Sequence, residues 1–421
     1  MAPRARILAV LFAVNCLNIY DRQVLGALAE PVRREFGLSD MQIGALSTLF
    51  TLVYAVAGMP LGRAADARSR RGLLAAGVAL WASLTALGGL AASYAMLLAS
   101  RLGVAVGEAV CAPAAASWIG DLFPPERRSR ALATFMLGVP LGVALSFAVS
   151  GPVGQAWGWR AAMLLAAAPA VALAPALLAL PEPPRGDAGG MPASASPWGL
   201  FRIPAFAWIV ASGALVNFNL YTISTFLPAF LTRFHQLSVA RAGFWAGIGS
   251  GAAGLAGGLL AGGWGDRRTG ARGRLGAAAL AAGAAAPAAL AGIVLPSGSA
   301  AGAIVLLMTA YGLLNMYYGL VYAAIQDLVA PRLRGTAMAV YFLAMYLCGA
   351  SFGPLVTGRL SDLLAHRAAA GGPTTELARA AGLHQAMYVV PAFSLALALV
   401  LAGGARAART GGDPGSTTVS S

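Results

Sequence analysis

Four ionisable residues interrupt two apolar segments that are each long enough to cross a membrane: Asp21 and Arg22 in one, Arg101 and Glu108 in the other. A charge in hydrocarbon is costly unless it is paired or hydrated, so such residues mark candidate functional sites. Arg101 and Glu108 share a helix face about two turns apart, which makes Asp21 the natural partner of Arg101. A carboxylate held between desolvation and a nearby arginine can gain or lose a proton as its surroundings change, so Asp21 and Glu108 are candidate proton carriers. The alternative is that Asp21 and Arg22 form an interfacial pair, with Arg22 reaching water.

Polar side chains repeat at helical spacing along two later apolar segments. They are Asn217, Tyr221 and Ser224 in one segment and Tyr311, Asn315, Tyr318 and Tyr322 in the other. Aromatic rings with polar tips suit an amphiphilic ligand that has both a tail and a head group. We interpret the two stripes as walls of a substrate cavity. Hydrogen bonding between packed helices explains any single member of them equally well.

A short loop between two apolar segments carries one acidic residue and several arginines. An aspartate at a helix end can attract the positive N-terminus of another helix, and arginines favour the cytoplasmic surface. The loop recurs in weaker form in the second half of the chain, where glycine and alanine replace the arginine pair. A plain positively charged loop is the alternative. We expect a cytoplasmic gate built from Gly62, Asp66, Arg70, Arg71 and Asp266.

The composition indicates a polytopic membrane protein, since 58% of the 421 residues are hydrophobic and 10% are charged. The net charge of +14 comes from arginine alone, and the arginines cluster in short loops, which argues against a nucleic-acid-binding surface. The cysteine spacing predicts neither a disulfide framework nor a metal site, and no nucleotide-binding loop is present. The twelve predicted spans are 7–30, 41–62, 72–92, 95–119, 130–152, 160–180, 204–232, 242–263, 275–295, 300–326, 335–358 and 385–405.

Internal repeats indicate that the chain is a duplicated six-span unit. Asp121–Arg128 resembles Asp327–Arg334, and each follows the fourth span of its half. We expect an all-α membrane protein with twelve transmembrane helices in two pseudo-symmetric six-helix bundles, the major facilitator fold. Cytoplasmic termini place most loop arginines inside. The predicted parts are the N-terminal half 1–180, a cytoplasmic linker 181–203, the C-terminal half 204–405 and a disordered tail 406–421.

Small residues account for two further patterns. The fifth and eighth spans carry glycine or serine about every four residues, which lets helices approach closely, either as static packing or as a moving contact between the halves. Gly349–Gly353 matches the Gly-x-Ser-x-Gly pattern of serine hydrolases, so an intramembrane hydrolase using Ser351 is the competing class. That motif requires a strand–turn–helix elbow and a nearby histidine. Ser351 falls in mid-helix, and we interpret the match as packing.

Three segments resemble a known family. Asn18–Leu25 is similar to the first-span signature of the spinster-like transporters of the major facilitator superfamily, and Arg101–Ala109 followed by Pro113 resembles their fourth span. Gly62–Arg71 resembles the signature loop of the whole superfamily. The resemblance implies alternating access around a central cavity, with protonation at Asp21 and Glu108. It also implies that Arg101 modulates these carboxylates or meets an anionic head group.

The residues and the resemblance together predict a transporter and not an enzyme. We expect a proton-coupled secondary transporter of an amphiphilic, lipid-like substrate such as a lysolipid or a sphingosine-phosphate-like molecule. A proton-driven multidrug or organic-anion transporter is the alternative. Arg22 and Arg101 are the expected charge partners or head-group ligands. We expect no cofactor or metal and no nucleic-acid partner. The expected protein is a monomer in the bacterial inner membrane with both termini in the cytoplasm.

Overall fold

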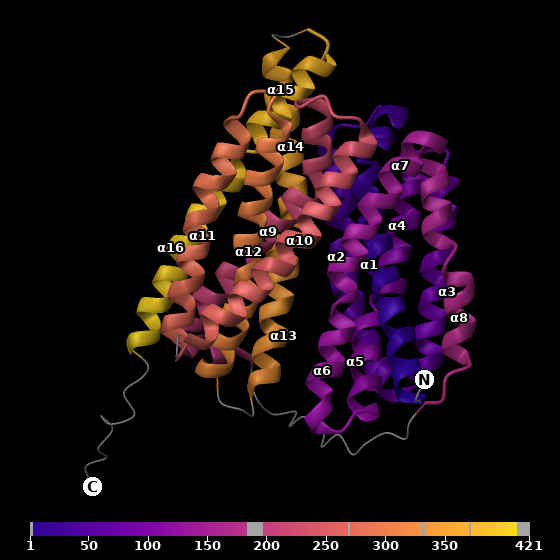
Figure 1. The fold of residues 1–421 in the computed structure, drawn as a ribbon, viewed down its shortest axis with the longest axis vertical. Coiled ribbons are helices and arrows are strands. Elements are labelled where there is room, and N and C mark those ends of the chain that lie inside the picture. Colours follow the sequence, from indigo (N-terminus) through magenta and orange to yellow (C-terminus); the bar gives the residue numbers. More distant parts are fainter. Residues whose placement is uncertain (1–2, 183–196, 268–269, 330–332, 370–371, 411–421) are drawn as a thin grey trace.

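The computed structural model describes residues 3–182, 197–267, 270–329, 333–369 and 372–410, which are helical almost throughout (Figure 1). The helices of the first half are α1 Pro3–Phe36, α2 Asp40–Ala67, α3 Arg70–Gly89, α4 Tyr94–Glu108, α5 Cys111–Leu122, α6 Pro125–Met136, α7 Gly138–Ala167 and α8 Ala170–Leu178. Those of the second half are η1 Pro197–Arg202, α9 Pro204–Arg233, α10 Val239–Arg267, α11 Gly270–Val294, α12 Ala300–Leu328, α13 Arg334–Ala344, the π-helix η3 Met345–Ala350, α14 Phe352–Ala368, α15 Glu376–Ala386 and α16 Val389–Thr410.

Twelve membrane passes follow from these helices. Among the described residues, 11 helical stretches are long and apolar enough to cross a membrane. One of them, Thr134–Leu178, has 45 residues, which is about 68 Å of helix against a hydrocarbon core of roughly 30 Å. It reverses at Gly158, whose φ of 84° and ψ of 157° are not helical. This stretch therefore supplies the fifth and sixth passes, and the predicted all-α fold of twelve spans is confirmed.

Local sequence signals set several helix ends. Gly37, with φ of 62°, adopts the left-handed conformation directly after α1. Ser39 begins α2 with a reciprocal capping box, in which its hydroxyl accepts from the Gln42 amide and the Gln42 side chain accepts from the Ser39 amide. Ser69 and Ser93 cap α3 and α4 with one side-chain hydrogen bond each, accepted from the amides of Gly72 and Met96. These signals mark where α1 ends and where α2, α3 and α4 begin.

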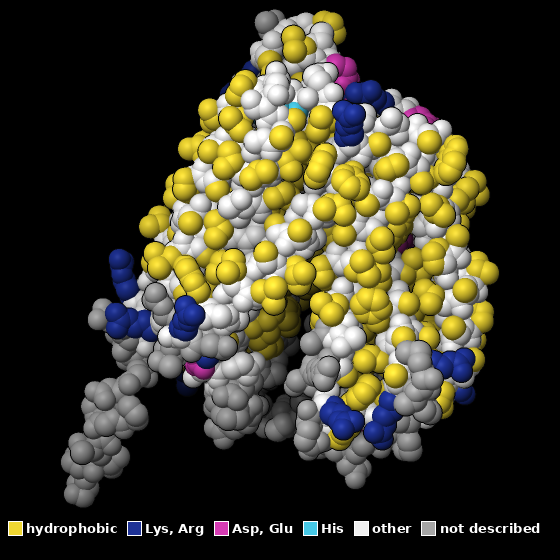
Figure 2. All heavy atoms as spheres, viewed as in Figure 1, with side chains coloured by type: hydrophobic (Ala, Val, Ile, Leu, Met, Phe, Trp, Pro, Cys, Tyr) yellow, Lys and Arg dark blue, Asp and Glu magenta, His cyan; other side chains and the backbone are white. Residues whose placement is uncertain are grey.

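The two halves stand side by side (Figure 1). We call the end of the molecule where α1 begins and α16 ends the termini face, and the end where α1 leads into α2 the far face. Across the halves, α2 packs against α14 and α7 packs against α10. Figure 2 shows a hollow between the halves at the termini face, whereas the far face is closed.

Two predicted spans were too short. The eleventh was expected to end at 358 and the twelfth to begin at 385, but α14 continues to Ala368 and α15 begins at Glu376. The two helices form a hairpin that projects from the far face (Figure 1). The added segments are rich in charged residues. A prediction from apolar runs therefore stops before them, although the backbone remains helical.

The two glycine stripes have different partners. On α7, Gly138 and Gly142 lie against the backbone of α1, and Ser146 donates to the Tyr20 carbonyl at 2.8 Å. These α7 residues therefore pack within the first half. On α10, Gly243, Gly247 and Gly251 lie against α7, and Gly151 of α7 lies against the start of α10. The α10 stripe thus contributes to the contact between the halves.

Candidate functional site

Asp21 and Arg101 form a buried ion pair between the first and fourth passes. Arg101 Nη1 lies 3.2 Å from Asp21 Oδ1, and the two side chains are 2% and 1% exposed. Arg101 Nη2 also donates to the Asp21 carbonyl at 3.1 Å, and the Thr85 hydroxyl donates to Asp21 Oδ2 at 2.5 Å. The predicted partnership of Asp21 with Arg101 is confirmed. Because three donors surround this aspartate, it is the fixed member of the charged group.

Arg22 and Glu108 form the second pair, and it is less complete. Arg22 Nε donates to Glu108 Oε2 at 3.2 Å, while Arg22 Nη2 and Glu108 Oε1 are buried atoms that have no hydrogen-bond partner among the described residues. The Arg22 guanidinium lies 4.1 Å from the centroid of the Tyr54 ring. Arg22 therefore faces the centre of the molecule and is not an interfacial residue. Each partner therefore keeps one free polar atom. Arg22 can bind a ligand in place of Glu108, and Glu108 can bind a proton in place of Arg22.

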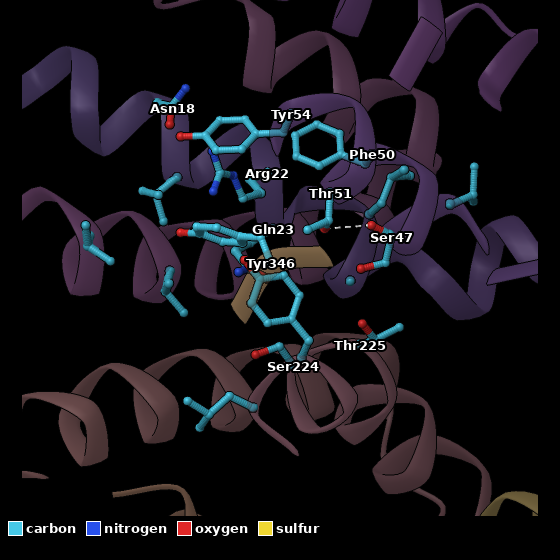
Figure 3. Close-up of a pocket in the computed structure, with 18 of the residues that line it drawn as sticks. Asn18, Arg22, Gln23, Ser47, Phe50, Thr51, Tyr54, Ser224, Thr225 and Tyr346 are labelled. Carbon is cyan, nitrogen blue, oxygen red and sulfur yellow. Dashed lines mark hydrogen bonds between the residues drawn. The ribbon is translucent and has the colours of Figure 1, made fainter. Parts of the chain in front are cut away.

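These charges border a central cavity of about 360 Å³ between the two halves. Figure 3 shows Arg22 beside Tyr54, with Asn18 and Gln23 nearby and Ser224 and Thr225 on the opposite wall. Arg101 also lines the cavity, whereas Asp21 and Glu108 lie behind the wall. The cavity thus has a cationic, polar side on the first half.

Five of the seven stripe residues line this space. They are Tyr221, Ser224, Tyr311, Asn315 and Tyr318, which form part of the second-half wall. The other two support that wall from behind. Asn217 accepts a hydrogen bond from the Tyr318 hydroxyl at 3.0 Å, and the Tyr322 ring packs on Tyr318 with centroids 5.6 Å apart. The spacing of the stripes predicted the helix faces correctly, but not which residues reach the cavity.

Sequence reasoning missed the part of the cavity wall that comes from α2 and η3. Ser47, Thr51 and Tyr54 line the cavity at helical spacing, a pattern that the sequence already contains. Tyr346 reaches the same cavity from η3, and its ring centroid lies 6.2 Å from that of Tyr54. No sequence signal indicates the π-helix, a distortion that often occurs at functional sites.

A network of ion pairs closes the far face. Arg233 at the end of α9 lies 2.7 Å from Glu30 and 2.8 Å from Asp40, and all three side chains are at least 97% buried. Arg33 also pairs with Glu30 and reaches Glu376 of α15 at 2.7 Å. These pairs join the second half to the first. The pairs between the halves were not predicted, because their partners are far apart in sequence.

Close backbone contact supports this closure. A Cβ on Gly44 would collide with the Pro354 carbonyl, and a Cβ on Gly358 would collide with the Asp40 carbonyl. The Asp362 carboxylate accepts from the amides of Asp40 and Met41 at the start of α2. The second and eleventh passes therefore touch backbone to backbone at the far face.

The termini face carries two related arginine clusters. Arg70 is 1% exposed and donates to Asp121 at 2.5 Å, to Glu182 at 3.1 Å and to the Ser117 carbonyl at 3.1 Å. In the second half, Arg274 donates to Asp327 at 2.7 Å and to the Ala323 carbonyl at 3.2 Å.

The two clusters make the duplication visible in side-chain contacts, since each arginine reaches the same two positions at the end of a fourth pass. The second-half loop lacks the arginine pair, but Arg274 in the first turns of α11 takes its place.

Burial tends to raise the pKa of the Glu182 carboxyl, but hydrogen bonds from Ser69 and Arg70 outweigh this and the net pKa is lowered. Arg71 lies 3.4 Å from the Leu180 carbonyl. The side chains of Asp66 and Asp266 lie outside the described part of the structure.

The hydrolase alternative is wrong. The Ser351 hydroxyl is fully buried and donates to the Tyr346 carbonyl at 2.8 Å. Ser351 joins two helical segments, and the described residues include no strand that could form a nucleophile elbow. A Cβ on Gly349 or Gly353 would collide with the α9 backbone. The motif is helix packing, as the sequence analysis favoured.

A two-halved helical bundle around a cavity that is open at one face and closed at the other defines a membrane transporter. The sequence profile of the Major Facilitator Superfamily matches residues 11–354. The chain belongs to this superfamily.

Three similar proteins refine this assignment. An MFS-type efflux pump of Mycolicibacterium smegmatis is 35% identical over 368 residues, which are 84% of each chain. Protein spinster of Drosophila melanogaster is 31% identical over 182 residues, which are 43% of this chain and 30% of that protein. A solved bacterial homolog of the human lysosomal transporter spinster, in an inward-facing and unoccupied conformation, has 28% identity and a TM-score of 0.83, with 97% of this chain and 98% of that chain covered. These matches indicate a transporter and not an enzyme.

Proposed function

We propose that the protein is a proton-coupled secondary transporter that moves an amphiphilic, lipid-like substrate by alternating access. The observation that carries the proposal is the incomplete Arg22–Glu108 pair beside the central cavity. Arg22 lines the cavity, whereas Glu108 is fully buried behind it. A ligand can therefore reach the cation without reaching the carboxylate.

This arrangement links substrate to proton. An anionic head group that takes Arg22 leaves Glu108 without its cation. A buried carboxylate without a cation is more stable when protonated. Asp21, paired with Arg101, holds the second charge or passes the proton on. Head-group binding and protonation therefore favour each other, as coupling requires.

The cavity wall supports an amphiphilic substrate. Its first-half side presents Arg22, Asn18 and Gln23, while its second-half side presents tyrosine rings. Phosphate and carboxylate groups suit an arginine, and hydrocarbon or ring systems suit the aromatic wall. A lysolipid or a sphingosine-phosphate-like molecule has both parts.

A drug or organic-anion transporter is the second candidate. The relative from Mycolicibacterium smegmatis is described as an efflux pump, and its match extends over 84% of both chains. A compact anion would occupy the same arginine and the same aromatic wall. Substrate panels in reconstituted vesicles distinguish the candidates, because a lysolipid transporter requires a tail and a transporter of compact anions does not.

We also propose the membrane orientation and the division of the chain. The arginine-rich loops, including Arg70, Arg71 and Arg274, lie at the termini face, which we assign to the cytoplasm. The structure then has its cavity open to the cytoplasm. Residues 1–180 and 204–405 form the two moving halves, and Gly62, Asp66 and Asp266 belong to the cytoplasmic gate. The compartment is the bacterial inner membrane.

The decisive experiment is transport in proteoliposomes with and without an imposed proton gradient. Glu108→Gln imitates the protonated carboxylate, and we expect this variant to bind and exchange substrate but to lose gradient-driven flux. Asp21→Asn should behave similarly. Glu35→Gln is the matched control, because Glu35 is 41% exposed at the far end of α1 and pairs with Arg160. Full gradient-driven flux in Glu108→Gln would show that Glu108 is not the coupling group.

A further inference from the structure

A slot of about 280 Å³ lies between α7 and α10, next to the central cavity. Val139, Val143, Tyr311 and Asn315 line both spaces, so the slot lies next to the cavity and these four side chains stand between the two. The remaining lining comes from apolar or small residues of the two helices. They are Pro140, Ser250, Gly251, Gly254, Leu255, Gly258 and Leu259.

The slot exists because α7 and α10 diverge towards the termini face. At the crossing, a Cβ on Gly247 would collide with Phe147, and one on Gly251 would lie 3.2 Å from Ala144. One turn further, a Cβ on Gly254 would have no neighbour closer than 3.9 Å, and one on Gly258 would have none within 4 Å. Close packing explains the first part of the glycine stripe and leaves the second part unexplained.

The outer edge of the slot faces the bilayer. Leu255 and Leu259 are 47% and 71% exposed on a membrane-spanning helix, so their side chains contact lipid. The inner edge is the cavity wall at Tyr311 and Asn315. A molecule in the slot therefore touches hydrocarbon at one end and the polar cavity at the other.

We propose that this slot holds the hydrocarbon tail of the substrate while its anionic head group lies at Arg22, and that Gly258 keeps the slot open. The inference rests on the proposed function and adds a second subsite to it. Ligand pockets measure about 300–1,000 Å³, and the central cavity alone lies at the lower limit of that range. Cavity and slot together accommodate a single-chain amphiphile, and the tail gains the apolar surroundings that the charged side of the cavity does not offer.

Photo-crosslinking tests the subsite directly. The probe is a lysophosphatidic acid with a diazirine at the end of a palmitoyl-length chain, added to the protein in nanodiscs and mapped by mass spectrometry. In the unmodified protein, labels should fall on residues that line the slot alone, such as Pro140, Leu255 and Leu259, and excess unlabelled palmitoyl lysophosphatidic acid should remove them. Gly258→Leu should abolish these labels by filling the slot.

Chain-length preference gives an independent measurement. Each buried methylene contributes roughly fourfold in affinity, so palmitoyl-length lysophosphatidic acid should compete better than the octanoyl form. In Gly258→Leu this advantage should fall by at least about tenfold. Gly262→Leu is the matched control, because a Cβ on Gly262 also has nothing within 4 Å but the residue does not line the slot. It should retain the wild-type preference.

The outcomes separate this inference from the proposed function. Competable labels confined to the central cavity, with an unchanged chain-length preference in Gly258→Leu, would overturn the slot and leave the transporter proposal standing. Competable slot labels without gradient-driven flux would support the slot and overturn proton coupling. An absence of competable labels anywhere would overturn both the slot and the lipid-like substrate.

Discussion

Removing Arg233 should open the far face. Arg233 belongs to the second half, and its two carboxylate partners, Glu30 and Asp40, belong to the first. Arg233→Met keeps the volume of the side chain and removes its charge. Both carboxylates then remain buried in the closed state without their main cation, but they become hydrated when the far face opens. The penalty therefore acts on the closed state alone.

The structure sets the size of this effect. Breaking a buried ion pair by removing one partner costs about 3–5 kcal/mol. Glu30 retains its contacts with Arg33 and Arg34, so we take the lower end, about 3 kcal/mol. Since 1.4 kcal/mol corresponds to about a factor of ten, the ratio of closed to open far faces should fall roughly a hundredfold.

Arg34→Met provides the control. Arg34 pairs with the same Glu30 at 2.9 Å, but its side chain is 60% exposed. Exposed ion pairs contribute at most about 1 kcal/mol, so this variant should change the equilibrium little. The same substitution is thus made at two arginines that share one carboxylate and differ in burial.

Distances between spin labels measure the opening. Labels at Trp157 and Gly298 report the far face, and labels at Arg127 and Arg272 report the termini face. Cys348 must first be replaced by alanine, because it is an exposed thiol. In Arg233→Met we expect a longer far-face distance to appear together with a shorter termini-face distance. An unchanged distance distribution in Arg233→Met, or an equal shift in Arg34→Met, would refute the reasoning.

Three further predictions follow from the contacts. Tyr318→Ala should weaken ligand binding in nanodiscs about threefold to tenfold and Tyr388→Ala should not, because only Tyr318 lines the cavity; equal losses would mean ordinary packing. Arg70→Ala should lower the thermal unfolding temperature more than Arg274→Ala, since the side chains are 1% and 22% exposed; the reverse order would contradict the role of burial. The lowered pKa of Glu182 means that this carboxylate stabilises the protein above its ordinary pKa of 4.5 and loses that effect as the pH falls below it. Glu182→Gln should therefore show a smaller loss of thermal stability on acidification than the wild type, and an equal loss would exclude this role.

The one-dimensional pattern of the chain was enough to predict the spans and the duplication. Hydrocarbon thickness imposes a length on every apolar run, and a duplicated unit leaves matching residues such as Asp121 and Asp327 at equal depth. The pairing of Asp21 with Arg101 was also predicted, because a buried charge requires a partner and Glu108 lies two turns away from Arg101 on the same helix. The tyrosine stripes were predictable as helix faces, since helical periodicity is a local property.

Tertiary structure decided which groups meet across helices. Arg22 pairs with Glu108, and Arg233 joins Glu30 to Asp40, through the rotation and crossing of helices that are far apart in sequence. Tyr346 reaches the cavity because η3 is wound as a π-helix. Such contacts depend on helix rotation, kinks and the relative position of the two halves, which the energy of the whole packed bundle determines and no local pattern encodes.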